Sequence, residues 1–197
     1  RAFVTGALRR RPLWLAVMAA MLAGAVAIAW QVLNPLAAIF VFLGAFFYGV
    51  VYTVWLKRRT WLNIVVGGLA GSFAVLAGAA AVDTQIGALP GLLAVTLFLW
   101  TPPHFWSLAI ANEAEYAAAG VPMLPVVVGP ERAAQAVFVS AVLLVAGSLL
   151  PVAFGAGLVY LLCSVAGGTY FVYRAWQLTR SVNRGTAIGS FLASIVQ

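Results

Sequence analysis

Long uncharged stretches follow one another along the chain and are separated by short charged segments. A membrane-spanning helix needs about 20 mostly apolar residues, and most of these stretches are that long or twice as long. Asn34 with Pro35, and the segment 151–157, mark turns inside the two longest stretches. The pattern predicts helices at 12–31, 35–55, 62–82, 88–111, 133–152, 156–174 and from residue 186 onward. It therefore predicts an all-α integral membrane protein.

Composition and the placement of charge support this fold class. Hydrophobic residues make up 64% of the chain and charged residues 8%, whereas soluble domains have about 45–50% and about 25%. These values exclude an ordinary soluble enzyme, a disordered tail and a coiled coil. If the helices cross a membrane in turn, all 11 Lys and Arg residues lie on one side and Asp83 lies on the other. The positive-inside rule makes the basic side cytoplasmic. The net charge of +7 then reflects topology in a lipid bilayer, with no nucleic-acid partner.

The first polar cluster is the run Lys57, Arg58 and Arg59 between two predicted spans, with Tyr52 before it and Asn63 after it. One interpretation is a topological anchor. The other is a phosphate clamp, in which Lys57 supplies a point charge and Arg58 or Arg59 supplies a planar fork. Asn63 lies about one turn inside the next span, where a carboxamide needs a partner. Charge alone does not separate the two interpretations.

The second cluster contains Pro102, Pro103 and His104. The two prolines are expected to interrupt their helix and to free backbone carbonyls, which is tolerated where protein or a cavity satisfies them. His104 is the only histidine of the chain. It is either a functional ligand or base, or a packing residue held by a hydrogen bond.

The third cluster is the longest loop on the basic side, which carries Glu113, Glu115 and Tyr116. If the helix continues beyond Pro103, Glu115 falls near the same stripe as His104, about 16 Å along the axis. Carboxylates that face cations across a cavity suit a magnesium-bound diphosphate, because magnesium prefers carboxylate and phosphate oxygens. The alternative is a solvated loop.

Together, the stretches 52–68, 100–110 and 115–127 resemble the UbiA family of intramembrane prenyltransferases, in its haem-farnesylating branch. The resemblance covers essentially the whole chain as one domain, 1–197, with about seven of the family's nine spans. It implies a chain truncated at both ends, with the family's first acidic motif upstream of the segment that starts at Arg1. Ala114 stands where the family often has a second acid, which leaves Glu115 as the main acid of its loop.

The resemblance implies transfer of a farnesyl group from farnesyl diphosphate to the vinyl group of protohaem IX (haem b), which gives haem O and releases diphosphate. It implies Mg²⁺ with the diphosphate, haem b as substrate rather than cofactor, and haem A synthase or oxidase assembly factors as partners in a bacterial plasma membrane. The implied catalytic residues are Glu115, His104 and Tyr116, and the implied metal ligands are Glu115 and Glu113. The implied substrate-binding residues are Tyr52, Lys57, Arg58, Arg59, Asn63 and His104.

Two other functions are weighed against this one. A UbiA-type enzyme could prenylate an aromatic or quinone-precursor acceptor in place of haem. A membrane transporter domain, from a different class, would have charges near the bilayer midplane. Because the charges of this chain gather at one membrane face, the sequence favours a site at the interface.

Overall fold

A computed structural model describes residues 12–197, and every regular element in that range is helical. The predicted basic segment with Arg1, Arg9, Arg10 and Arg11 lies outside the described residues, as does the start of the family resemblance. The helices are α1 (Pro12–Ile28) with η1 (Ala29–Leu33), α2 (Pro35–Phe46) with η2 (Phe47–Leu56), α3 (Asn63–Gly67), α4 (Leu69–Val82), α5 (Ala88–Ala111), α6 (Glu113–Ala118), α7 (Leu124–Val128), α8 (Pro130–Leu149) with η3 (Leu150–Phe154), α9 (Leu158–Arg180) and α10 (Arg184–Val196).

Within the described residues, six helical segments are long and apolar enough to cross a membrane. They are Leu13–Leu33, Pro35–Leu56, Asn63–Val82, Ala88–Ala111, Pro130–Phe154 and Leu158–Arg180. The seventh predicted helix is α10, which is apolar and has 13 residues. The all-α membrane fold predicted from the sequence is confirmed.

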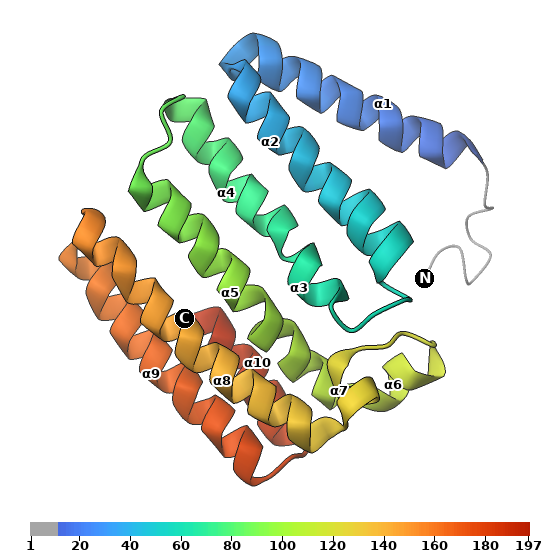
Figure 1. Cartoon of the computed structure of the whole chain (residues 1–197), viewed down its shortest axis with the longest axis vertical. Helices are drawn as coiled ribbons and strands as arrows, with labels where there is room; N and C mark the ends of the chain where they lie inside the picture. Colours follow the sequence, from blue (N-terminus) through green and yellow to red (C-terminus); the bar gives the residue numbers. More distant parts are fainter. Residues whose placement is uncertain (1–11) are drawn as a thin grey trace.

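Consecutive helices pack beside one another, so α2 lies between α1 and α4, and α5 lies between α4 and α8 (Figure 1). The short helix α10 packs against both α5 and α9. The α2–α3 turn, α6, α7 and the α9–α10 turn all lie at one end of the bundle (Figure 1). We call it the basic end, because Lys57, Arg58, Arg59, Arg132, Arg180 and Arg184 lie there.

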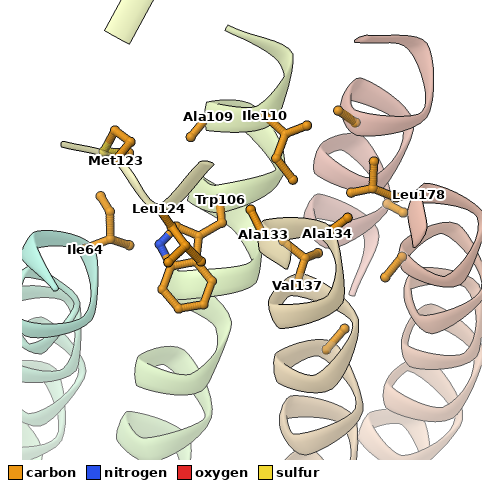
Figure 2. Packing of buried hydrophobic residues seen from close by; sticks show 14 of the residues in the cluster. Ile64, Trp106, Ala109, Ile110, Met123, Leu124, Ala133, Ala134, Val137 and Leu178 are labelled. Carbon is orange, nitrogen blue, oxygen red and sulfur yellow. The ribbon is translucent and has the colours of Figure 1, made fainter. Parts of the chain in front are cut away.

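Most of the buried hydrophobic residues lie in the half of the bundle formed by α5, α8, α9 and α10. Trp106 of α5 is 6% exposed and lies between Ile64 of α3 and Val137 of α8, with Leu124 of α7 beside it (Figure 2). Many of the surrounding core residues are alanines, which let helix backbones approach closely. These alanines are Ala109, Ala133, Ala134, Ala141, Ala175, Ala187 and Ala193, each with no exposed surface.

The expectation that two prolines interrupt their helix is wrong. Pro102 and Pro103 lie inside α5, which runs from Ala88 to Ala111. The carbonyls that lose an N–H partner are those of Phe98 and Leu99, four residues before the two prolines. Neighbouring hydroxyls bind other carbonyls of the same helix, from Thr101 to Leu97 O at 3.0 Å and from Ser107 to Pro103 O at 2.7 Å. Packed neighbouring helices make proline tolerable in membrane helices.

The helix does not continue to Glu115 either. It ends at Ala111, and Asn112 has φ −126°, outside the helical region, before α6 begins at Glu113. The Asn112 carboxamide donates to Leu108 O at 2.9 Å at this end. The expected stripe from His104 to Glu115 on one helix is therefore not formed.

Candidate functional site

The last turns of the second span are wider than those of an α-helix. The backbone N–H of Lys57 donates to Tyr52 O, five residues back, at 2.8 Å. The Thr53 hydroxyl also reaches back five residues, to Tyr48 O at 2.7 Å. Such wide turns are rare and are frequent at functional sites. The sequence predicts an ordinary helix here, and its hydrophobic pattern contains no sign of the difference.

The wide turns bring two tyrosines and a lysine into one column that leads to the basic end. The rings of Tyr48 and Tyr52 are 5.8 Å apart, and the Lys57 ammonium lies 5.8 Å from the centre of the Tyr52 ring. This last distance is within the range of a cation–π contact. The Tyr52 ring is therefore held between a second ring and a cation.

A polar cavity of about 680 Å³ lies at the basic end, next to this column. Two cations, Lys57 and Arg58, and one carboxylate, Glu115, line the same space. The other lining residues are Thr53, Asn112, Tyr116, Ala119 and Val121. The arrangement can hold an anion that carries several negative charges, since the guanidinium of Arg58 can bind two oxygens at once.

A second, apolar cavity of about 290 Å³ lies between η2, α3, α4 and α5. Its lining residues are Tyr48, Tyr52, Ile64, Gly67, Gly68, Ala70, Gly71, Leu97, Trp100, Thr101 and Phe105. Tyr52 lines this cavity, while its neighbours Thr53 and Lys57 line the polar one. Because the Lys57 ammonium lies 5.8 Å from the centre of the Tyr52 ring, the two cavities are neighbours.

Gly67 sets the position of this ring. A Cβ atom at Gly67 would lie 2.8 Å from Cδ2 and 3.4 Å from Cβ of Tyr52. Contacts under 3 Å do not occur between real Cβ atoms and their neighbours, so any side chain at Gly67 displaces the ring. The absence of a side chain at this position allows α3 to approach η2 closely.

Gly67→Ala is expected to lower the free energy of unfolding by about 1–3 kcal/mol, the usual cost of inserting an atom into a packed site. The matched control is Gly78→Ala in α4, where a Cβ would meet nothing within 4 Å. The control is expected to unfold at the wild-type temperature or above it, because alanine favours helix more than glycine does. Unfolding in detergent, followed by circular dichroism, measures both variants. Equal behaviour of the two would contradict the close contact with Tyr52.

Asn63 is fully buried at the start of α3 and lines neither cavity. Its Nδ2 donates to the backbone oxygen of Lys57 at 3.3 Å, and its Oδ1 has no hydrogen-bond partner among the described residues. Asn63 thus contacts the backbone of the basic turn rather than the space that the cations line.

His104 packs against α10. Its Nδ1 lies 2.7 Å from the Ser194 hydroxyl, and its ring stacks on Trp100 at 4.0 Å and contacts Phe191 at 4.5 Å. Trp100 lines the apolar cavity, whereas His104 lines neither cavity. Of the two interpretations of this histidine, the geometry matches the hydrogen-bonded packing residue, which lies behind a wall of the site.

The structure brings together Tyr52, Lys57, Arg58, Glu115 and Tyr116 around the two cavities. It leaves Arg59, Asn63, His104 and Glu113 outside their linings. Sequence reasoning missed Asn112, which lines the polar cavity. The signal that could have found it is its position at the end of an apolar stretch, directly before the acidic loop.

No group of three His, Cys, Asp or Glu side chains gathers as a metal site within residues 12–197. The polar cavity has one carboxylate, Glu115, and one carboxamide, Asn112. This donor set fits a magnesium ion that also binds phosphate oxygens, because magnesium commonly uses one or two carboxylates together with substrate phosphates.

Comparison with known proteins adds to this geometry. Residues 1–195 match the UbiA prenyltransferase family. The chain is 52% identical over its whole length to protoheme IX farnesyltransferase 2 of Paramagnetospirillum magneticum, of which it covers 68%. Over 176 residues it is 51% identical to protoheme IX farnesyltransferase 1 of the same organism, of which it covers 62%. Over 168 residues it is 42% identical to protoheme IX farnesyltransferase of Chloroflexus aurantiacus, of which it covers 29%. No solved structure matches the chain.

Proposed function

The chain belongs to the UbiA prenyltransferase family, and on that premise we propose that it transfers a farnesyl group from farnesyl diphosphate to a vinyl group of protohaem IX. The products are haem O and diphosphate. The names of the relatives support this acceptor. The chain spans 68%, 62% and 29% of those three relatives, so the activity proposed is that of the whole protein.

The observation that carries the proposal is the pair of neighbouring cavities that the contact between Lys57 and the Tyr52 ring links. One cavity is lined by Lys57, Arg58 and Glu115, and the other is lined almost entirely by apolar groups. A prenyl diphosphate has the same two halves, a strongly charged head and an apolar tail. The head fits the polar cavity, and the first part of the tail fits the space beside Gly67 and Gly71.

The reaction breaks the bond between C1 of the farnesyl chain and the diphosphate oxygen. The bonding electrons leave with the diphosphate, and the vinyl group of the haem supplies the pair that forms the new carbon–carbon bond. Water adds to the other vinyl carbon and loses a proton, which gives a hydroxyalkyl side chain. The barrier lies in the charge that develops on the leaving group.

Lys57 and Arg58 stabilise that developing charge from fixed positions, which is worth more than the same contacts in water. Magnesium, when bound with the diphosphate and Glu115, would neutralise further charge on the leaving group. Tyr116 lines the same cavity and can donate its hydroxyl to a phosphate oxygen. Tyr52 lines the apolar cavity close to Lys57, so its ring lies near the proposed position of C1 of the farnesyl chain.

The remaining candidate residues act through these groups. Asn63 holds the backbone of Lys57, and His104 supports Trp100 from behind. We assign them as positioning residues. The basic end is proposed to face the cytoplasm of a bacterial plasma membrane, as the positive-inside rule expects. Haem A synthase or oxidase assembly factors are the proposed protein partners, because they would use the product.

The test uses membranes that contain the protein expressed from its complete gene, supplied with haem b, farnesyl diphosphate and magnesium. Extracted haem is analysed by mass spectrometry. A new species that is heavier than haem b by one farnesyl group and one hydroxyl is expected. Unchanged haem b with correctly folded protein would overturn the haem acceptor, and the same membranes supplied with an aromatic acceptor would then test the other acceptor class.

A further inference from the structure

A third hollow, of about 410 Å³, lies at the basic end, away from the proposed reaction site. It is lined by Arg174, Trp176, Gln177, Arg180, Ser181, Gly185 and Thr186. All of these residues belong to α9, the α9–α10 turn or the first turn of α10. None of them lines the polar cavity or the apolar cavity. The hollow is therefore a separate place on the molecule.

The two arginines in this hollow have no acidic partner. Neither guanidinium forms an ion pair with a carboxylate in the described part of the chain, and the Nε of Arg174 is buried without a hydrogen-bond partner. A buried donor without a partner is costly, so an anion in this hollow would stabilise Arg174 most, while the exposed Arg180 adds a second positive charge beside it.

Each of the two guanidinium groups has a close neighbour in the structure. Gly189 of α10 faces Arg174 so closely that a Cβ atom there would overlap the guanidinium nitrogen Nη2. The guanidinium carbon of Arg180 lies 5.8 Å from the centre of the Trp176 ring. Arg174 therefore packs against α10 at a position without a side chain, and Arg180 lies beside an aromatic ring at the edge of the hollow.

The position of the hollow indicates which anion it takes. Arg174 lies six residues before Arg180, which is about 9 Å along the helix, so the hollow extends from the end of α9 toward the apolar part of the bundle. Tyr173 and Trp176 are 51% and 45% exposed, and exposed Tyr and Trp are typical of the membrane–water interface. Further along α9, Leu162 and Val165 are also exposed. An occupant thus meets charge at the level of the head groups and apolar surface beside it.

We propose that this hollow binds the phosphate group of an anionic phospholipid. Arginine is suited to phosphate because its planar fork can contact two oxygens. Basic pockets between membrane helices are known to take acidic lipid head groups. The acyl chains would lie along the exposed apolar residues of α9. Such a lipid would tie α9 to α10, the helix that supports His104 through Ser194 and Phe191.

The protein expressed from its complete gene, in detergent with added phosphatidylglycerol or phosphatidylcholine, provides the test by native mass spectrometry. The test variants are Arg174→Gln and Arg180→Gln. The matched control is Arg184→Gln, an exposed arginine at the same turn that does not line the hollow. Arg174→Gln is expected to weaken retention of phosphatidylglycerol at least about tenfold, as the loss of a charge-assisted contact implies. Arg180→Gln removes an exposed charge and is expected to weaken retention about three- to fivefold. The control is expected to change it by less than about twofold, because its side chain does not line the hollow.

Three results would overturn the proposal. Equal losses in Arg184→Gln and Arg174→Gln would mean a general attraction to the basic end. Displacement of the lipid by the same concentration of inorganic phosphate would mean a site for free phosphate. Unchanged lipid retention with weaker haem binding in Arg174→Gln would mean a site for the haem carboxylates. If Arg174→Gln does not fold, Arg180→Gln and Arg174→Lys provide the test; the latter keeps the charge but loses the fork, and partial retention is expected.

Discussion

Glu115→Gln is expected to lower the turnover of farnesyl transfer at least about a hundredfold, a typical loss when one group that stabilises transition-state charge is removed. Glu115 is the carboxylate among the residues that line the polar cavity. The substitution keeps the size and hydrogen-bonding capacity of the side chain but removes the charge that would hold a metal ion next to the diphosphate. Single-turnover measurements with a saturating prenyl substrate separate this loss from weaker binding.

Two other carboxylates at the basic end serve as controls for this prediction. Glu131 lies in the first turn of α8 and lines neither cavity, so Glu131→Gln is expected to keep wild-type turnover. Glu113 lies two residues before Glu115, outside both linings. Successive helical residues are 100° apart, so the two side chains of α6 leave the helix on different sides. A Glu113→Gln variant as inactive as Glu115→Gln would contradict the assignment of a single carboxylate to the metal.

The second large effect is expected from two adjacent arginines that differ only in where they point. Both side chains are exposed, but Arg58 lines the polar cavity and Arg59 does not. Arg58→Gln is expected to lower kcat/KM for farnesyl diphosphate about 10- to 100-fold, because a hydrogen bond to a charged group contributes about 1.5–3 kcal/mol. Arg59→Gln is expected to remain close to wild type.

The pair also separates the two interpretations of the basic run. A topological anchor depends on the number of positive charges, so both substitutions should then have the same effect. A phosphate clamp depends on which side chain reaches the cavity, so only Arg58→Gln should then lower the activity. Equal losses in the two variants, together with reduced membrane insertion, would favour the anchor. Initial rates over a range of farnesyl diphosphate concentrations, normalised to the inserted protein, distinguish these outcomes.

The sequence predicts the helices well because a membrane span depends only on the length and polarity of a continuous stretch of residues. An uncharged stretch of sufficient length is enough to place a span, and the predicted bounds differ from the observed ones by a few residues at most ends. The cations at 57–59 and the acid at 115 are found for the same reason, since each interrupts an apolar pattern.

What the sequence does not predict depends on direction around a helix axis. The pattern does not show that Arg58 rather than Arg59 faces a cavity, or that Glu115 rather than Glu113 does so. It also does not show that His104 points to Ser194, 90 residues away in the chain. The proline pair is misjudged because its effect depends on the packed helices around it, which appear only in the folded bundle.

The wide turns of Phe47–Leu56 make chain length itself part of this site. A turn closed by a bond five residues back contains one residue more than an ordinary α-turn. Removing one residue between Tyr52 and Lys57, such as Val54, would shift every following position by about 100° around the axis. Lys57 would then leave the Tyr52 ring, although no residue that lines the polar cavity had been replaced. Insertions and deletions are well tolerated in loops, but in this helix they would act like substitutions in the site.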